Sequence, residues 1–225
     1  MATDQSEVLV RKAAIRFNNA SLVTIFAGQV PHQEKFMVHD WIIQRSEFFQ
    51  RVLDGQRAEV DKRVIELPVD DPITVQNYFE FIYTDELSVL SEKCTGERCT
   101  HFRTIAELYM FADKLQDLRC KKAFIQKLCS HILERKRDGK SFIPECFLVG
   151  KIYKGTVEGD PIRVLMVDVW KTCRMTTERV HNLPKDFLKD LIASCQDSIT
   201  TTYPYQDNFF HKGAKYYMDK VAGSD

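Results

Sequence analysis

The first third of the chain contains three short runs of apolar residues, and their pattern predicts β-strands. In residues 22–27 the side chains of both faces are largely apolar, as expected for a strand covered on two sides. Gly28 and Pro31 indicate a turn, after which residues 32–38 form the predicted partner strand. Residues 64–67 predict a third strand.

Apolar residues at helical spacing follow these strands. Residues 41–43 predict a short helix, and Ser46 suits the cap of the next one, because its hydroxyl accepts from free first-turn amides. Asp71-Pro72 predicts a helix start, with an acidic cap and a proline at the first helical position. Longer amphipathic helices are expected over residues 102–115 and 118–135. The broad, largely apolar stripe predicted behind Pro72 consists of Ile73, Gln76, Phe79 and Ile82, with Val75, Tyr78 and Phe81 beside them.

Beyond residue 140 the pattern is helical only. We expect helices over residues 143–153, after Asp160-Pro161 and after Asn182-Leu183-Pro184. Residues 200–225 are aromatic without regular spacing, so this end is predicted to be irregular. Two interpretations of its aromatic residues 203–217 stay open: a partner-binding surface, or a segment packed back on the chain's own helices.

A charged stretch, ERKRDGK at residues 134–140, is the best candidate for a boundary between modules. It divides the chain into an N-terminal segment of residues 1–17, a domain of residues 18–135 and a helical extension of residues 136–225. The N-terminal segment is expected to be partly helical, because three apolar positions and one lysine position fall there at helical spacing. These positions are Val8, Leu9, Lys12 and Ile15.

Composition excludes several classes of function. Lys plus Arg equals Asp plus Glu at 32 each, so the chain lacks the basic excess that binding to nucleic-acid phosphates requires. Seven cysteines, an odd number scattered through predicted helices, favour a reducing compartment. There is neither a secretory signal core nor a run of about 20 apolar residues. We therefore expect an intracellular protein of the cytoplasm or nucleus that does not contact membranes.

Two groups of residues suggest chemistry, and each has a plainer interpretation. Cys94, Cys99 and His101 supply three zinc ligands at an unusual spacing, whereas a structural site uses four, so no metal site is predicted. His39 is either a pH switch or metal ligand, or a residue that holds a strand-to-helix turn through ring hydrogen bonds; we favour the turn. The glycines form no phosphate-binding loop and no nucleophile motif occurs, so we predict no cofactor and no enzymatic activity.

Seven short motifs follow one another between residues 17 and 135. They are SLVTIFAG (21–28), FMVH (36–39), SEFF (46–49), IELP (65–68), DP (71–72), FIYT (81–84) and LYMFADKL (108–115). Their order resembles that of a BTB/POZ domain. The resemblance implies an α+β fold, with a small β-sheet flanked by a helical cluster and followed by an all-helical extension, and it implies protein binding rather than chemistry. The extension, with IYKGT and DPIRVLMVDVW, resembles that of fungal BTB proteins.

Two features depart from the family pattern. BTB domains of transcription factors usually carry an acidic residue before the first strand's valine and a basic residue after the histidine, where this chain has Leu22 and Asp40. Corepressor recruitment through such a charged pocket is therefore not expected. Adaptors of cullin-type ubiquitin ligases often have a hydrophobic-x-Glu step before the third strand, and Arg57-Ala58-Glu59 lacks its hydrophobic residue.

These observations lead to three hypotheses about function. The main one is a self-associating scaffold or adaptor, a homodimer whose interface lies near five residues by resemblance. The second is a substrate adaptor of a cullin ubiquitin ligase that binds cullin through the face around residues 46–60 and 101–115. The third is an enzyme that uses a Cys–His site. The five interface residues are Leu9, Ala13, Trp41, Ile42 and Phe49.

Overall fold

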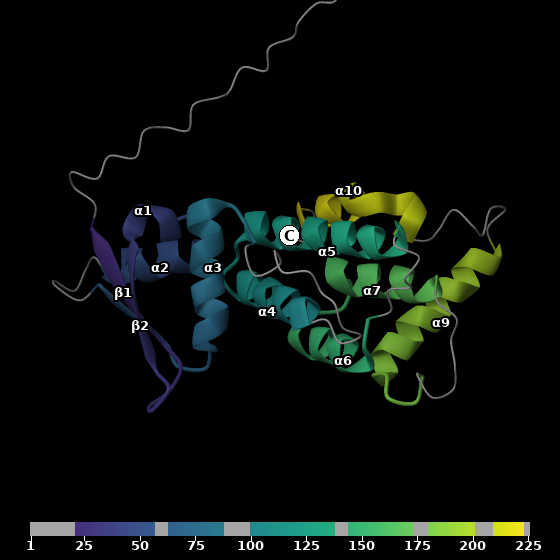
Figure 1. Ribbon diagram of the computed structural model, residues 1–225, viewed down its shortest axis with the longest axis horizontal. Helices are drawn as coiled ribbons and strands as arrows, with labels where there is room; N and C mark the ends of the chain where they lie inside the picture. The colour runs from purple at the N-terminus through teal and green to yellow at the C-terminus, as the bar shows by residue number, and fades with distance from the viewer. Residues whose placement is uncertain are drawn as a thin grey trace, which may run out of the picture.

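A small sheet lies at one end of an elongated, mostly helical molecule (Figure 1). The computed structural model describes residues 21–56, 63–87, 100–137, 144–172, 180–200 and 209–222. None of the helices in these ranges is long and apolar enough to cross a membrane.

The sheet has the strand order β2-β1-β3. The central strand β1 (Leu22–Ala27) pairs antiparallel with β2 (Glu34–His39) and parallel with β3 (Val64–Leu67). Val23, Ile25 and Ala27 are fully buried under the helices, whereas Leu22 on the opposite face is 41% exposed. The prediction that β1 is covered on both faces was therefore wrong. Both faces of the strand carry apolar side chains, but among the described residues helices pack against only one face of the sheet.

Five helices complete the described part of the chain up to residue 137, and local signals start two of them. Ser46 Oγ accepts from the amide of Phe49 at 3.3 Å, and Asp71 accepts from the amide of Thr74 at 3.0 Å with Pro72 next to it, as predicted. The stripe predicted behind Pro72 is buried except for two of its residues, Gln76, which is exposed, and Ile73, which is 65% exposed. The helices are α1 (Asp40–Ile43), α2 (Glu47–Gln56), α3 (Pro72–Thr84), α4 (Thr100–Lys114) and α5 (Leu118–Arg137).

The helical extension consists of α6 (Cys146–Gly155), α7 (Pro161–Lys171), α9 (Lys185–Thr200) and α10 (Phe209–Ala222). Asp160 caps α7 by accepting from the amide of Ile162 at 3.0 Å, as its Asp-Pro start predicted. The last helix corrects the expectation of an irregular end. It contains a non-helical residue, Gly213, and runs alongside α5 (Figure 1). Phe209 and Tyr217 are buried, so these two aromatic residues pack on the chain's own helices.

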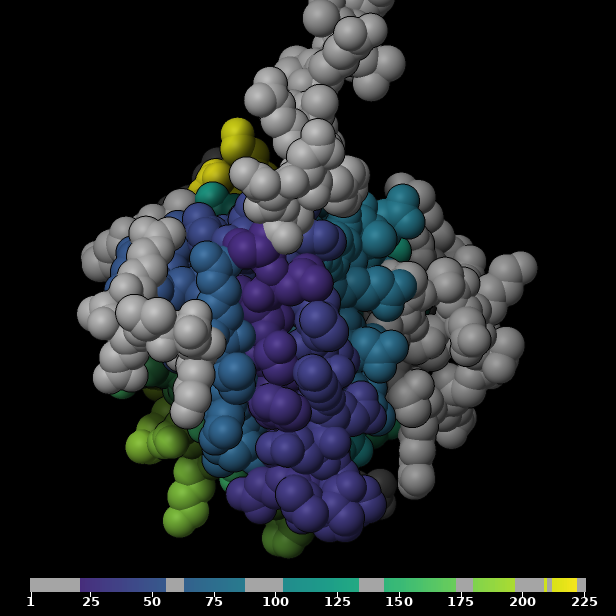
Figure 2. Space-filling model, turned by 90° about the vertical axis from the view of Figure 1, so that its left-hand side faces the viewer, coloured from purple at the N-terminus to yellow at the C-terminus, as the bar shows by residue number. Residues whose placement is uncertain are grey.

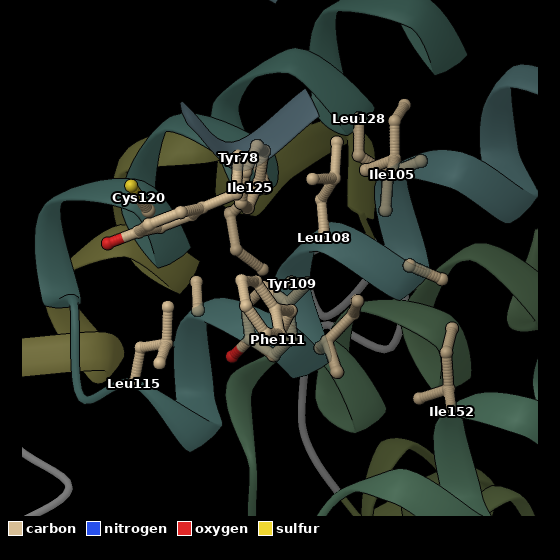
Figure 3. Close-up of a cluster of buried hydrophobic side chains, with 14 of the residues drawn as sticks. Tyr78, Ile105, Leu108, Tyr109, Phe111, Leu115, Cys120, Ile125, Leu128 and Ile152 are labelled. Atoms are coloured by element: carbon tan, nitrogen blue, oxygen red, sulfur yellow. The ribbon is translucent and has the colours of Figure 1, made fainter. Parts of the chain in front are cut away.

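Buried side chains from the sheet, from α1 to α5 and from the extension belong to one hydrophobic core. Helix α4 is at its centre, because it packs against α3, α5 and α6. Figure 3 draws this region, with Tyr78 of α3, Tyr109 of α4, Ile125 of α5 and Ile152 of α6 around a shared interior. The molecule is thus an α+β fold, a small sheet flanked by helices with a helical extension packed against it.

Candidate interaction surface

His39 joins the edge strand β2 to helix α1, and Tyr83 of α3 holds it in place. The backbone N–H of His39 donates to the Tyr83 hydroxyl at 2.9 Å, and Nδ1 of the imidazole lies 2.8 Å from the same oxygen. Since the phenol oxygen already accepts from the backbone, its own proton is available to Nδ1. This arrangement matches the turn-holding role expected for the histidine.

Exposed aromatic and apolar side chains surround this turn. The Trp41 side chain is 38% exposed, and its ring centroid is 6.1 Å from that of His39. Tyr83 is 44% exposed on the other side of the histidine. Leu22 lies opposite His39 in the β1–β2 register, so an exposed apolar residue of the sheet borders the aromatic group. We call His39, Trp41 and Tyr83 the aromatic corner.

The outer face of the sheet extends from this corner. Met37 on β2 is 58% exposed and lies opposite Thr24, which in turn lies opposite Val64 on β3. In Figure 2 the described strands form the surface that faces the viewer, with no described helix in front of them. Contiguous exposed apolar side chains of this kind are typical of protein-binding sites. The strand alternation indicates the outward positions, but it did not indicate which face stays open.

The five residues predicted to lie near an interface have different positions. Trp41 is on the surface, whereas Ile42 of α1 is 5% exposed and Phe49 of α2 is fully buried in the core. Leu9 and Ala13 lie outside the described residues. Sequence reasoning did not select Tyr83, Leu22 or Met37, although the apolar outward positions of β1 and β2 were a signal for the last two.

The surface proposed for cullin binding is largely covered by the chain itself. Along α4, from Arg103 to Lys114, only these two terminal residues are exposed. Helix α6 covers one side of α4, where Lys151 forms an ion pair with Glu107 and the Arg103 guanidinium lies 5.6 Å from the Phe147 ring centroid. An added Cβ at Gly155 would collide with Met110, which shows how closely the two helices approach.

Helix α2 keeps a polar exposed side. Glu47, Gln50, Arg51 and Asp54 are exposed there, and the Arg51 guanidinium contacts the Gln116 side chain. Arg57, Ala58 and Glu59, where the hydrophobic-x-Glu step was sought, lie outside the described residues.

Two of the four described cysteines, Cys120 and Cys129, are buried thiols with a raised pKa. Burial raises the pKa of the Cys120 thiol, as do the neighbouring Asp117 carboxylate and their hydrogen bond. Burial likewise raises the pKa of Cys129 to about 12. Thiols with raised pKa are poor nucleophiles. Among the described residues, no three His, Cys, Asp or Glu side chains are grouped so as to hold a metal ion. Cys94, Cys99 and the His101 side chain lie outside that part of the structure.

Comparison with known proteins agrees with the arrangement of sheet and helices. The family model described as BTB/POZ domain matches residues 18–132, about half of the chain. A comparison with curated proteins found no match.

Proposed function

The chain belongs to the BTB/POZ domain family, whose members are protein–protein interaction modules, and on this premise we propose that it self-associates and acts as a non-enzymatic scaffold or adaptor. The observation that carries the proposal is the exposed aromatic corner of His39, Trp41 and Tyr83 where β2 joins α1. Aromatic side chains surrounded by apolar area contribute most of the binding energy in protein interfaces. The seven cysteines favour an intracellular site of action.

In this proposal the five predicted interface residues have different tasks. Trp41 contacts the second copy directly, since a large part of its side chain is accessible. Ile42 and Phe49 lie in the core beneath α1 and support it from inside. Leu9 and Ala13 extend the interface from the N-terminal segment.

Sedimentation velocity of the full chain tests this function. Trp41→Ala removes an exposed aromatic ring from the proposed interface, so the dimer is expected to dissociate at concentrations where the parent chain stays associated. Tyr216→Ala is the matched control, because Tyr216 on α10 is 37% exposed against 38% for Trp41 and lies far along the chain. Equal association of the parent and Trp41→Ala chains would contradict self-association through α1.

The cullin-adaptor hypothesis has less support. One side of its α4 surface is covered by α6, so the polar side of α2 and the exposed residues Arg103 and Lys114 of α4 are the available parts of the predicted contact among the described residues. Affinity capture of the tagged full chain, scored for cullin, addresses it directly. Arg51→Glu reverses a charge on that side of α2 and Lys215→Glu makes the same change on α10. Cullin captured by the parent and Lys215→Glu chains, but lost with Arg51→Glu, would establish the adaptor role.

An enzymatic Cys–His site remains the third hypothesis. A thiol-reactive probe applied to the folded chain separates it from the others. Labelling of one cysteine well below pH 7 would indicate a depressed thiol pKa and revive the hypothesis. Uniformly slow labelling is expected instead.

A further inference from the structure

The outer face of the sheet has an apolar middle and opposite charges on its two edges. Phe26, at the centre of one row, lies opposite Lys35 on β2 and Glu66 on β3. Paired residues of neighbouring strands project from the same face, so this row reads Lys–Phe–Glu across the sheet. Both charged residues are exposed, and neither has an ion-pair partner among the described residues. The next row, Met37–Thr24–Val64, is uncharged.

We propose that a second copy of this chain stacks on this face, outer sheet against outer sheet. A twofold axis along β1, lying between the two sheets, places β2 of one copy over β3 of the other. Residues of one row stay level with each other under that rotation. Lys35 of each copy therefore faces Glu66 of the other, and Phe26 meets Phe26 on the axis. Stacked sheets pack about 10 Å apart, which extended Lys and Glu side chains together can span.

The charge pattern selects a second copy over an unrelated ligand. Contact between two identical faces forms two Lys35–Glu66 pairs, one at each edge of the row. This follows because the two opposite charges lie at opposite edges of the same row and the twofold axis exchanges the edges. A twofold axis running across the strands would instead place β2 over β2 and leave both charges without an opposite partner. Complementary charge at an interface fixes its register and disfavours other partners.

This contact goes beyond the self-association proposed at α1, and it is a weaker one. Three strands of up to six residues form a face of roughly 15 by 20 Å, which is less than a standard interface covers on each partner. A chain with two separate twofold contacts assembles beyond a dimer, into closed tetramers or open chains. The sheet contact would therefore join dimers formed at α1.

Charge reversal and charge exchange in the full chain test the sheet contact by sedimentation velocity over a wide range of concentrations. Lys35→Glu and Glu66→Lys each place like charges opposite one another, and each is expected to weaken the association of dimers by about tenfold. The double variant restores opposite charges and should associate as the parent does. Lys215→Glu on α10 is the control for net charge and should leave association unchanged.

Three outcomes would overturn the proposal: a parent chain that stays monomeric at every concentration, single variants that associate as the parent does, or a double variant as weak as the single ones. Circular dichroism of each variant establishes that it is folded. The Trp41→Ala background separates this contact from the one at α1. If the single charge variants still weaken association in that background and the double variant restores it, the sheet contact stands whether or not α1 forms an interface. Loss of dimers in that background with no effect of the charge variants would leave only the α1 interface.

Discussion

Tyr109 donates a hydrogen bond of 2.7 Å from its hydroxyl to Asp160 Oδ1, joining the central helix α4 to the cap of α7. The same pairing recurs between other elements. In each of the four tyrosine–aspartate pairs, burial and the aspartate acceptor raise the pKa of the phenol. The hydroxyls therefore stay protonated and act as donors. The other pairs are Tyr78–Asp117, Tyr153–Asp190 and Tyr217–Asp168.

Tyr109→Phe should lower the free energy of unfolding by about 1–3 kcal/mol, because the buried Asp160 carboxylate loses its phenol donor. Urea denaturation followed by circular dichroism measures the change. Tyr216→Phe is the control, since Tyr216 is partly exposed and the change is expected to cost less than about 0.5 kcal/mol. Similar losses for the two variants would show that the Tyr109–Asp160 bond contributes nothing specific.

Asp168→Ala should loosen α10 before the rest of the molecule. Asp168 Oδ2 accepts from Tyr217 at 2.8 Å and from Lys212 at 3.0 Å, and both donors belong to α10. Without the carboxylate, a buried hydroxyl and a largely buried ammonium group lose this acceptor. Hydrogen–deuterium exchange should then accelerate in residues 209–222, while exchange in β1 is unchanged. Equal acceleration in both regions would argue against a local role.

Ser46→Ala should cost about 1–2 kcal/mol of stability. The fully buried Ser46 hydroxyl accepts from the amide of Phe49 and donates at 2.5 Å to the carbonyl of Leu115, so it caps α2 and ties it to the end of α4. Ser130→Ala provides the comparison, because Ser130 is exposed and its hydroxyl donates to the carbonyl of Gln126 in the same helix. Denaturation curves that shift equally for the two variants would contradict this account.

Asp40 should make stability depend on pH in the acid range. Partial burial raises the pKa of its carboxyl, but hydrogen bonds from Ser21 and Arg63 outweigh this and leave the pKa below its ordinary value of 3.8. A lowered folded-state pKa contributes stability that is present above the unfolded pKa, about 3.9, and is lost as pH falls through the folded value. Thermal unfolding of Asp40→Asn should therefore approach that of the parent chain below pH 4. A difference between the two chains that stays constant at every pH would refute the linkage.

Local signals made much of the fold predictable. Asp71-Pro72, Asp160-Pro161 and Ser46 start helices where the sequence alone places them, because each cap acts within one turn of its own residue. The strand at residues 22–27 was predictable for the same reason, since alternation is a property of neighbouring side chains.

Features that depend on distant partners were not predictable. Helix α10 is interrupted at Gly213, and its buried Tyr217 is positioned by Asp168, 49 residues earlier in the chain. The exposure of Leu22 and Ile73 depends on where helices pack rather than on residue type. Trp41 was selected by resemblance, but Tyr83 joins it only because α3 returns to the end of β2.

The central position of α4 has a practical consequence for anyone who shortens this protein. Ending the chain at residue 135 removes α6, which packs against α4, and α10, which packs against α5. The truncated product would expose Tyr109, Leu128 and Ile132 to water and become prone to aggregation. Binding measured with it would then reflect non-specific hydrophobic association rather than specific recognition. Single substitutions in the intact chain are the sounder route to its partners.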